Sequence, residues 1–168
     1  MFELVIGAMI ARAGLIPQLG QEPDVIFDFV GRQIFVECKR VFSEKKIEER
    51  IRKAARQLKT HIKSESHCGL IAVSVSRTIN SGDVIWSVTS VADASRLLES
   101  KIFEIIHRLD PFLQELSHPA ISGVVFYITS PVHITGIGFS PVKRGRMYPM
   151  PGAVDLDFLK RLTRLLRL

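Results

Sequence analysis

Two segments rich in β-branched and aromatic residues, joined by a tight-turn sequence, constrain the fold most. Residues 24–29 (DVIFDF) and 33–38 (QIFVEC) have the composition of strands, and Val30-Gly31-Arg32 between them favours a tight turn. The pair therefore predicts a β-hairpin. A turn centred on Val30 and Gly31 places Asp24 opposite Glu37, with about 5 Å between the Cβ atoms of opposed residues.

The predicted hairpin brings three charged side chains together. Side chains alternate along a strand, so Glu37 and Lys39 point to one face and Cys38 to the other. Asp24 joins Glu37 and Lys39 on their face. Two carboxylates this close repel each other unless a cation lies between them, and hard oxygen ligands suit Mg²⁺ or Mn²⁺. With a lysine beside them, these groups suit metal-assisted hydrolysis of a phosphodiester. Asp28 is an alternative ligand on this face, but it lies farther from Glu37, so Asp24 is favoured.

These residues resemble the motif of the PD-(D/E)xK nuclease superfamily, which has the restriction-endonuclease-like fold. Pro23-Asp24 matches the first half of that motif, and Glu37-Cys38-Lys39 matches the second. Twelve residues separate Asp24 from Glu37, a spacing similar to that of archaeal Holliday-junction resolvases. The resemblance covers about residues 1–75. It implies an α/β sandwich with a mixed β-sheet flanked by helices.

The resemblance also implies roles for the motif residues. Asp24 and Glu37 would bind Mg²⁺ or Mn²⁺, the Cys38 carbonyl would add a ligand, and Lys39 would activate the attacking water. The implied function is a divalent-metal-dependent endonuclease that hydrolyses DNA. The alternative is a catalytically inactive module of the same fold that binds nucleic acid or protein. An ordinary solvated ion cluster on a surface hairpin is the remaining interpretation of the three charged residues.

Two further residues occupy places that often contribute to the site in this superfamily. A carboxylate from the first helix often joins the metal ligands, and Glu3 occupies that place. A glutamine in the helix after the motif is also common near the site, and Gln57 is the candidate. Each has a simpler interpretation. Glu3 would be a first-turn acid that interacts with the helix dipole, and Gln57 would be a polar residue beside the apolar stripe of its helix.

The segment after the motif is strongly basic. Residues 39–63 contain ten lysines and arginines but three glutamates, and a phosphate backbone would lie there. The alternative is a solvated helix face with pairs such as Glu48 with Arg52. A weaker hypothesis is a basic face that binds RNA or anionic lipid. The residues expected to contact nucleic acid are Arg40, Lys45, Lys46, Arg50, Lys53 and Arg56.

The rest of the chain alternates between helical and strand patterns, which predicts one α/β domain over residues 1–168. Helices are expected over about 2–13, 44–63, 93–109, 111–116 and 157–168, and strands over 69–75, 83–88, 121–129 and 133–139. Turns or loops are expected at 78–82 and at 143–151, which is basic and rich in proline. The helix within 155–168 is leucine-rich and offers a surface for a partner, so a homodimer is compatible with the sequence.

Composition limits the function classes. The chain has 46% hydrophobic and 24% charged residues, which excludes disorder, and its net charge of +6 favours a polyanionic partner. Cys38 and Cys68 form no disulfide framework, which favours a reducing cytoplasm. No segment reaches the roughly 18 to 20 apolar residues of a membrane span. No zinc-ligand spacing, nucleophile elbow or strong phosphate-binding glycine motif is present, so no small-molecule cofactor is expected.

Overall fold

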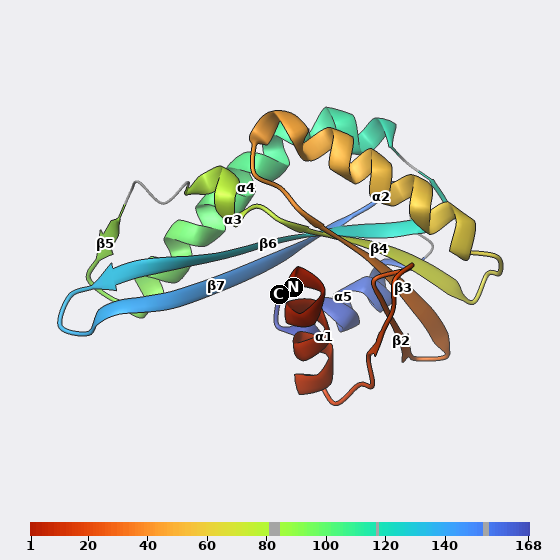
Figure 1. Ribbon diagram of the computed structural model, residues 1–168, viewed down its shortest axis with the longest axis horizontal. Helices are drawn as coiled ribbons and strands as arrows, with labels where there is room; N and C mark the ends of the chain where they lie inside the picture. Colours follow the sequence, from red (N-terminus) through yellow and green to blue (C-terminus); the bar gives the residue numbers. More distant parts are fainter. Residues whose placement is uncertain (81–84, 117, 153–154) are drawn as a thin grey trace.

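A mixed seven-stranded sheet flanked by helices forms the centre of the molecule (Figure 1). The computed structural model describes residues 1–80, 85–116, 118–152 and 155–168. The strands follow the order β1-β2-β3-β4-β6-β5, and β7 pairs with β6 along its other edge. β3, β4, β5 and β6 run parallel, whereas β2 and β7 are antiparallel to their neighbours. The strands are β1 (Gln18–Leu19), β2 (Val25–Phe29), β3 (Arg32–Arg40), β4 (His67–Ser74), β5 (Trp86–Val88), β6 (Ile121–Ile134) and β7 (Gly138–Pro149).

The predicted hairpin is confirmed in both pairing and register. β2 and β3 pair antiparallel, with Asp28 opposite Gln33 as the turn position predicts. Val30 and Gly31 have φ values of 49° and 72°, the left-handed pair that a two-residue turn of this type requires and that glycine favours. β2 begins one residue after Asp24, so Asp24 lies just before the paired part of the hairpin.

Helices cover both faces of the sheet. α1 (Phe2–Arg12) and α5 (Leu156–Leu166) lie on one face, and α2 (Ile47–His61) and α4 (Val91–Glu115) lie on the other (Figure 1). A short 3₁₀ helix, Glu44–Lys46, precedes α2, and a short helix, α3 (Ser76–Ile79), follows β4. This arrangement confirms the expectation of an α/β fold with a mixed sheet between helical layers.

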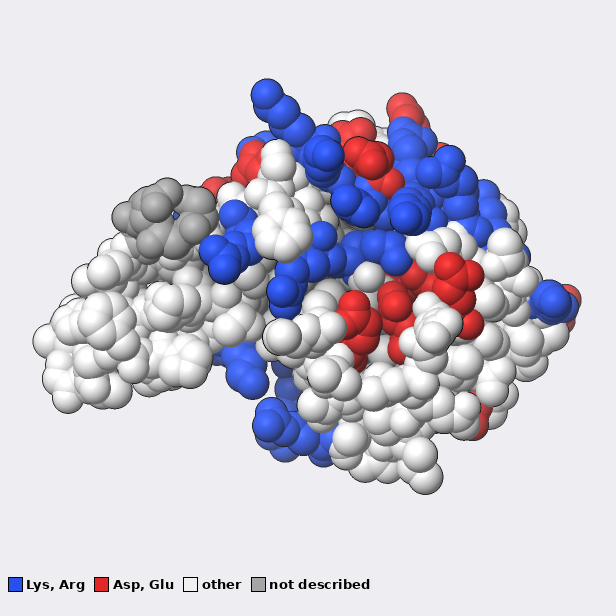
Figure 2. Space-filling model, viewed as in Figure 1, with Lys and Arg blue, Asp and Glu red and all other residues white. Residues whose placement is uncertain are grey.

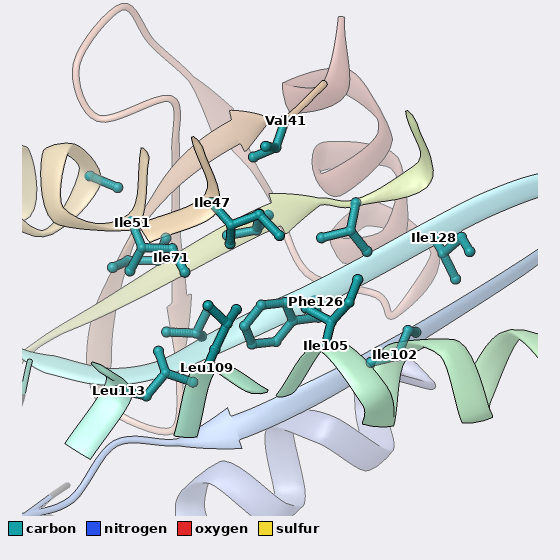
Figure 3. Close-up of a cluster of buried hydrophobic side chains, with 14 of the residues drawn as sticks. Val41, Ile47, Ile51, Ile71, Ile102, Ile105, Leu109, Leu113, Phe126 and Ile128 are labelled. Atoms are coloured by element: carbon teal, nitrogen blue, oxygen red, sulfur yellow. The ribbon is translucent and has the colours of Figure 1, made fainter. Parts of the chain in front are cut away.

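Each face of the sheet has its own apolar core. On the α2 and α4 face, Ile51, Ile105 and Phe126 are among the side chains at 2% exposure or less (Figure 3). The opposite cluster joins α1, the hairpin and α5, whose Phe158 and Leu162 are buried in it. The apolar face of the C-terminal helix therefore packs inside this chain, and its association with a second copy stays a prediction.

The break predicted before Pro111 is wrong, because α4 continues through this residue as one helix. A proline inside a helix removes one backbone hydrogen bond and crowds the preceding turn. Burial of Phe112 and Leu113, which continue the apolar stripe of Leu109, offsets that cost.

The loop predicted for residues 143–151 is also wrong. Residues 138–149 form β7, which pairs with β6 from Gly123 to Ile134 in one long antiparallel ribbon. β6 extends the strand predicted at 121–129 as far as Ile134. The strand predicted at 133–139 is wrong, because residues 135–137 form the turn that joins β6 to β7. β7 is an edge strand, where prolines and charged residues are tolerated because one side needs no ladder partner. The turn expected at 78–82 is wrong at its start, because Thr78 and Ile79 belong to α3. Residues 81–84, which the turn and the strand expected at 83–88 share, lie outside the described residues, and β5 begins at Trp86.

No helix in the described part of the chain combines the length and the apolar character that a bilayer span requires.

Candidate active site

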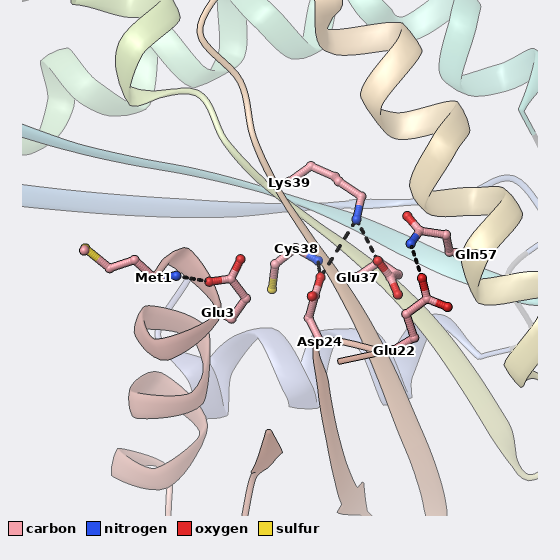
Figure 4. Close-up of polar contacts among 8 residues, drawn as sticks. All are labelled: Met1, Glu3, Glu22, Asp24, Glu37, Cys38, Lys39 and Gln57. Atoms are coloured by element: carbon pink, nitrogen blue, oxygen red, sulfur yellow. Dashed lines mark hydrogen bonds and ion pairs between the residues drawn. The ribbon is translucent and has the colours of Figure 1, made fainter. Parts of the chain in front are cut away.

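Asp24, Glu37 and Lys39 meet at the carboxyl end of β3 (Figure 4). Lys39 Nζ lies 2.7 Å from Glu37 Oε2 and 3.9 Å from Asp24 Oδ2. The main-chain N–H of Cys38 donates a hydrogen bond of 2.6 Å to Asp24 Oδ2. The structure therefore brings together the three side chains that the hairpin pattern predicts.

Strand geometry explains this convergence. Phe35 belongs to the core on the α2 face and Cys38 to the core on the α1 face, so alternation directs Glu37 and Lys39 to the α2 side. Asp24 lies one residue before β2, where the hairpin register places it level with Glu37, and its carboxylate reaches the Cys38 N–H. The N–H and C=O of one residue in a strand point the same way. The Cys38 carbonyl is therefore directed toward the edge where Asp24 lies, as the predicted ligand role requires.

Burial makes the Glu37 carboxylate costly. Its side chain is 1% exposed, and its Oε1 atom has no hydrogen-bond partner among the described residues. Burial raises the pKa of Glu37, the ion pair with Lys39 opposes that shift, and the charges of Asp24 and Glu22 add to it. Two carboxylates share one ammonium here, so the cluster has an excess negative charge that a bound cation would neutralise.

Glu3 lies apart from these three residues. Its carboxylate pairs with the amino group of Met1, which holds its pKa below the ordinary value. In Figure 4 it lies on the α1 side, with the Cys38 thiol between it and Asp24. Burial raises the pKa of that thiol, and the charges of Asp24 and Glu3 add to the shift. Glu3 is thus a neighbour of the site without a direct contact to Glu37 or Lys39 in the structure.

Gln57 reaches the site through Glu22, a residue that the motif pattern did not indicate. The Nε2 atom of Gln57 lies 3.3 Å from Glu22 Oε1, and its own Oε1 is buried without a partner among the residues described. Glu22 is close enough to raise the pKa of Glu37. Its position directly before Pro23-Asp24 is a signal that could have identified it. Within the described residues no hydrogen bond joins Gln57 to Glu37 or Lys39, and Gln57 lies on the α2 side of the cluster (Figure 4).

The predicted basic surface lies over α2. Figure 2 shows acidic side chains gathered in one place, with a band of basic side chains above them. Arg50, Lys53 and Gln57 recur at spacings of three and four residues, so they share the flank of α2 that faces Glu22. Arg40, Lys45, Lys46, Lys53 and Arg56 are exposed, and Arg50 is half-buried.

The ion pairs in this region differ from the pairing within one helix, such as Glu48 with Arg52, that a solvated helix face would show. Glu44 pairs with Arg108 at 2.8 and 2.9 Å rather than within its own helix. Arg52 lies over the ring of Phe112, with 4.6 Å between the guanidinium carbon and the ring centroid. None of the six predicted nucleic-acid contacts forms an ion pair with a described carboxylate, so their charges remain available to a polyanion.

The oxygen atoms of this cluster supply part of the ligand set that a hard cation requires. Within the described residues, no group of three or more His, Cys, Asp and Glu side chains is arranged to hold a metal. Asp24 and Glu37 supply two carboxylates, and the buried Oε1 of Glu37 is an oxygen in need of a positive partner. Carboxylate and carbonyl oxygens are the ligands that Mg²⁺ and Mn²⁺ prefer. The two carboxylates and the Cys38 carbonyl therefore form the core of a candidate metal site.

No model of a known protein family matches this sequence, and neither a curated protein nor a solved structure matches it.

Proposed function

We propose that this protein is a divalent-metal-dependent endonuclease that acts on DNA and has a restriction-endonuclease-like fold. The observation that supports this most is the convergence of Asp24, Glu37 and Lys39, with one Glu37 oxygen buried and unpartnered among the described residues. An ion cluster on a solvated surface does not require a buried carboxylate with a raised pKa, because exposed ion pairs contribute little to stability wherever they lie. Perturbed carboxylates with a specific charge partner are typical of functional sites.

The local architecture agrees with the resemblance noted in the sequence. A helix with an acid in its first turn, α1, precedes the hairpin that carries both halves of the motif, and a basic helix, α2, follows it. β4 then returns parallel to β3. This order keeps the carboxyl end of β3 beside the basic flank of α2, where a phosphate backbone would lie against Arg50 and Lys53.

Each residue has a defined part in the proposed reaction. Asp24, Glu37 and the Cys38 carbonyl would hold Mg²⁺ or Mn²⁺, which supplies stabilisation of the charge that develops on the phosphoryl oxygens. Lys39 would hold the attacking water by donating a hydrogen bond from its ammonium group, and the proton of that water would pass to solvent. Gln57 would hold the Glu22 carboxylate in place on the α2 side of the cluster.

A cleavage assay tests the proposal. Linear duplex, single-stranded DNA and a four-way junction are incubated with the purified protein and Mg²⁺ or Mn²⁺, with and without a chelator. We expect cutting that the chelator abolishes, that Glu37→Ala and Lys39→Ala remove, and that Glu48→Ala, a change of an exposed acid on α2, leaves intact. DNA binding should survive Lys39→Ala. Salt-sensitive binding without cutting would replace the proposal with the inactive binding module of the same fold.

A further inference from the structure

A cavity of about 460 Å³ lies between the C-terminal turn of α1, β7 and the C-terminal end of α5. Four of the residues that line it are basic and none is acidic: Arg12, Lys143, Arg144 and Arg167. We propose that this cavity is a second phosphate-binding site, which takes a backbone phosphate of the DNA that occupies the active site. The inference rests on the function proposed above.

The charges around the cavity are not neutralised by the protein. None of the four cations forms an ion pair with a carboxylate of the described residues, and Arg144 donates to the carbonyl of Lys143 at 2.9 Å. Other cations nearby differ in this respect. Arg146, two residues farther along β7, pairs with Glu99 at 3.1 Å. The basic residues that line the cavity thus differ from Arg146 in having no carboxylate partner among the described residues.

Helix dipoles do not account for all of this charge. Arg12 lies in the last turn of α1 and Arg167 caps α5, and cations there offset the partial negative charge of about one half at each helix C-terminus. Lys143 and Arg144 add to the two helix-terminal arginines, so the basic residues that line the cavity outnumber the two helix C-termini. Lys143 and Arg144 come from β7 and have no helix terminus of their own to offset.

The backbone of Arg167 gives independent support. It has φ 53° and ψ 46°, the left-handed conformation that ends helices and that glycine normally supplies. An arginine in this conformation is disfavoured for the fold alone. Arg167 lines the cavity together with Arg12, Lys143 and Arg144.

The position of the cavity suits one nucleic acid spanning both sites. α1 carries Glu3 beside the active site and Arg12 at the cavity, and nine residues of helix span about 14 Å. The major groove of a duplex is about 12 Å wide, so a phosphate from the strand across the groove can reach the cavity. Figure 2 shows further basic side chains below the acidic group, opposite the band over α2.

The test measures binding of a labelled duplex to the full chain as a function of KCl concentration. Arg12→Gln and Arg167→Gly are compared with Arg161→Gln, an exposed arginine of α5 that does not line the cavity. We expect each cavity variant to weaken binding several-fold and to reduce the slope of log K against log salt by about 0.9 for each phosphate that is no longer neutralised. The control should keep the wild-type slope. Arg167→Gly should also keep or raise Tm, because glycine suits the left-handed position.

Two further measurements distinguish a backbone phosphate from free phosphate and from a lipid headgroup. Inorganic phosphate should shift the NMR amide signals of Ala13 and Gly145 in the wild type and not in Arg12→Gln. Unchanged slopes in both cavity variants, with metal-dependent cutting intact, would overturn this inference and leave the proposed function standing. If Arg12→Gln and Arg167→Gly lost binding to phosphatidylserine vesicles but bound the duplex as the wild type does, the inference would also be overturned, in favour of a membrane contact. Absence of any cutting would count against the nuclease instead.

Discussion

Replacing Glu37 with glutamine is expected to stabilise the metal-free protein at neutral pH. Burial raises the pKa of this carboxyl despite the opposing charge of Lys39, and Asp24 and Glu22 add to the shift. A raised pKa means that the native state keeps the proton to a higher pH than the unfolded chain, whose glutamate pKa is about 4.3. The native state therefore loses stability as the pH rises through this window. Glutamine has the same shape and does not titrate.

The size of the effect follows from the number of protons involved. Between the unfolded and native pKa values, one proton costs the wild type about 1.4 kcal/mol of unfolding free energy for each pH unit. For a chain of 168 residues, that corresponds to about 3 to 6 °C in Tm for each pH unit. The variant leaves Lys39 with Asp24 at 3.9 Å, so the ammonium keeps a counter-charge.

Thermal unfolding with a chelator, from about pH 4 to about pH 8, measures this difference for wild type, Glu37→Gln and the exposed-site control Glu48→Gln. The Tm advantage of Glu37→Gln should be smallest at the acid end and should grow as the pH rises. Saturating Mg²⁺ should then raise the Tm of the wild type more than that of the variant. A Tm difference that does not change with pH, or a Glu37→Gln protein less stable at neutral pH, would show that burial of the Glu37 charge does not destabilise the fold.

Three further predictions test the surface and the packing. Lys53→Ala should weaken duplex binding and lower the slope of log K against log salt concentration by about 0.9. Lys59→Ala, on the opposite flank of the same helix, should change that slope less. Fluorescence anisotropy measures both. Gly69→Ala would place a Cβ atom 2.5 Å from the Ala120 carbonyl oxygen, so urea unfolding should show a loss of about 1 to 3 kcal/mol. Leu98→Ala empties a fully buried position and should cost about 2 to 5 kcal/mol in the same assay; a loss under about 1 kcal/mol would contradict the described core.

The hairpin and the centre of the site were predictable because both depend on local rules. The turn at Val30 and Gly31 fixes the register, and strand alternation then fixes the faces of Glu37 and Lys39. Asp24 follows from the register alone, although it lies just outside the paired strand. No tertiary information was needed to bring these side chains together.

Long-range packing determined what the sequence did not reveal. The contact between Gln57 and Glu22 joins residues 35 positions apart, and no periodicity encodes it. The basic, proline-containing segment of β7 has the composition of a loop, and only its pairing with β6 makes it a strand. Likewise, Pro111 stays inside α4 because the core beneath it favours continuation of the helix. Arg12 and Arg167 meet at one cavity only after α1 and α5 pack on the same face of the sheet.

Nicking of a supercoiled plasmid by wild type and by Asp24→Asn, each with Mn²⁺ and with chelator, is the sharpest test of the proposed metal-dependent nuclease site. Asparagine keeps the size of the side chain and an oxygen that accepts from the Cys38 N–H, but it removes one carboxylate of the candidate metal site. We expect Mn²⁺-dependent nicking by the wild type and a rate at least about 100-fold lower for the variant, comparable to removing a group that stabilises transition-state charge. Equal nicking rates for the two proteins, or wild-type nicking that persists in chelator, would contradict the proposed site.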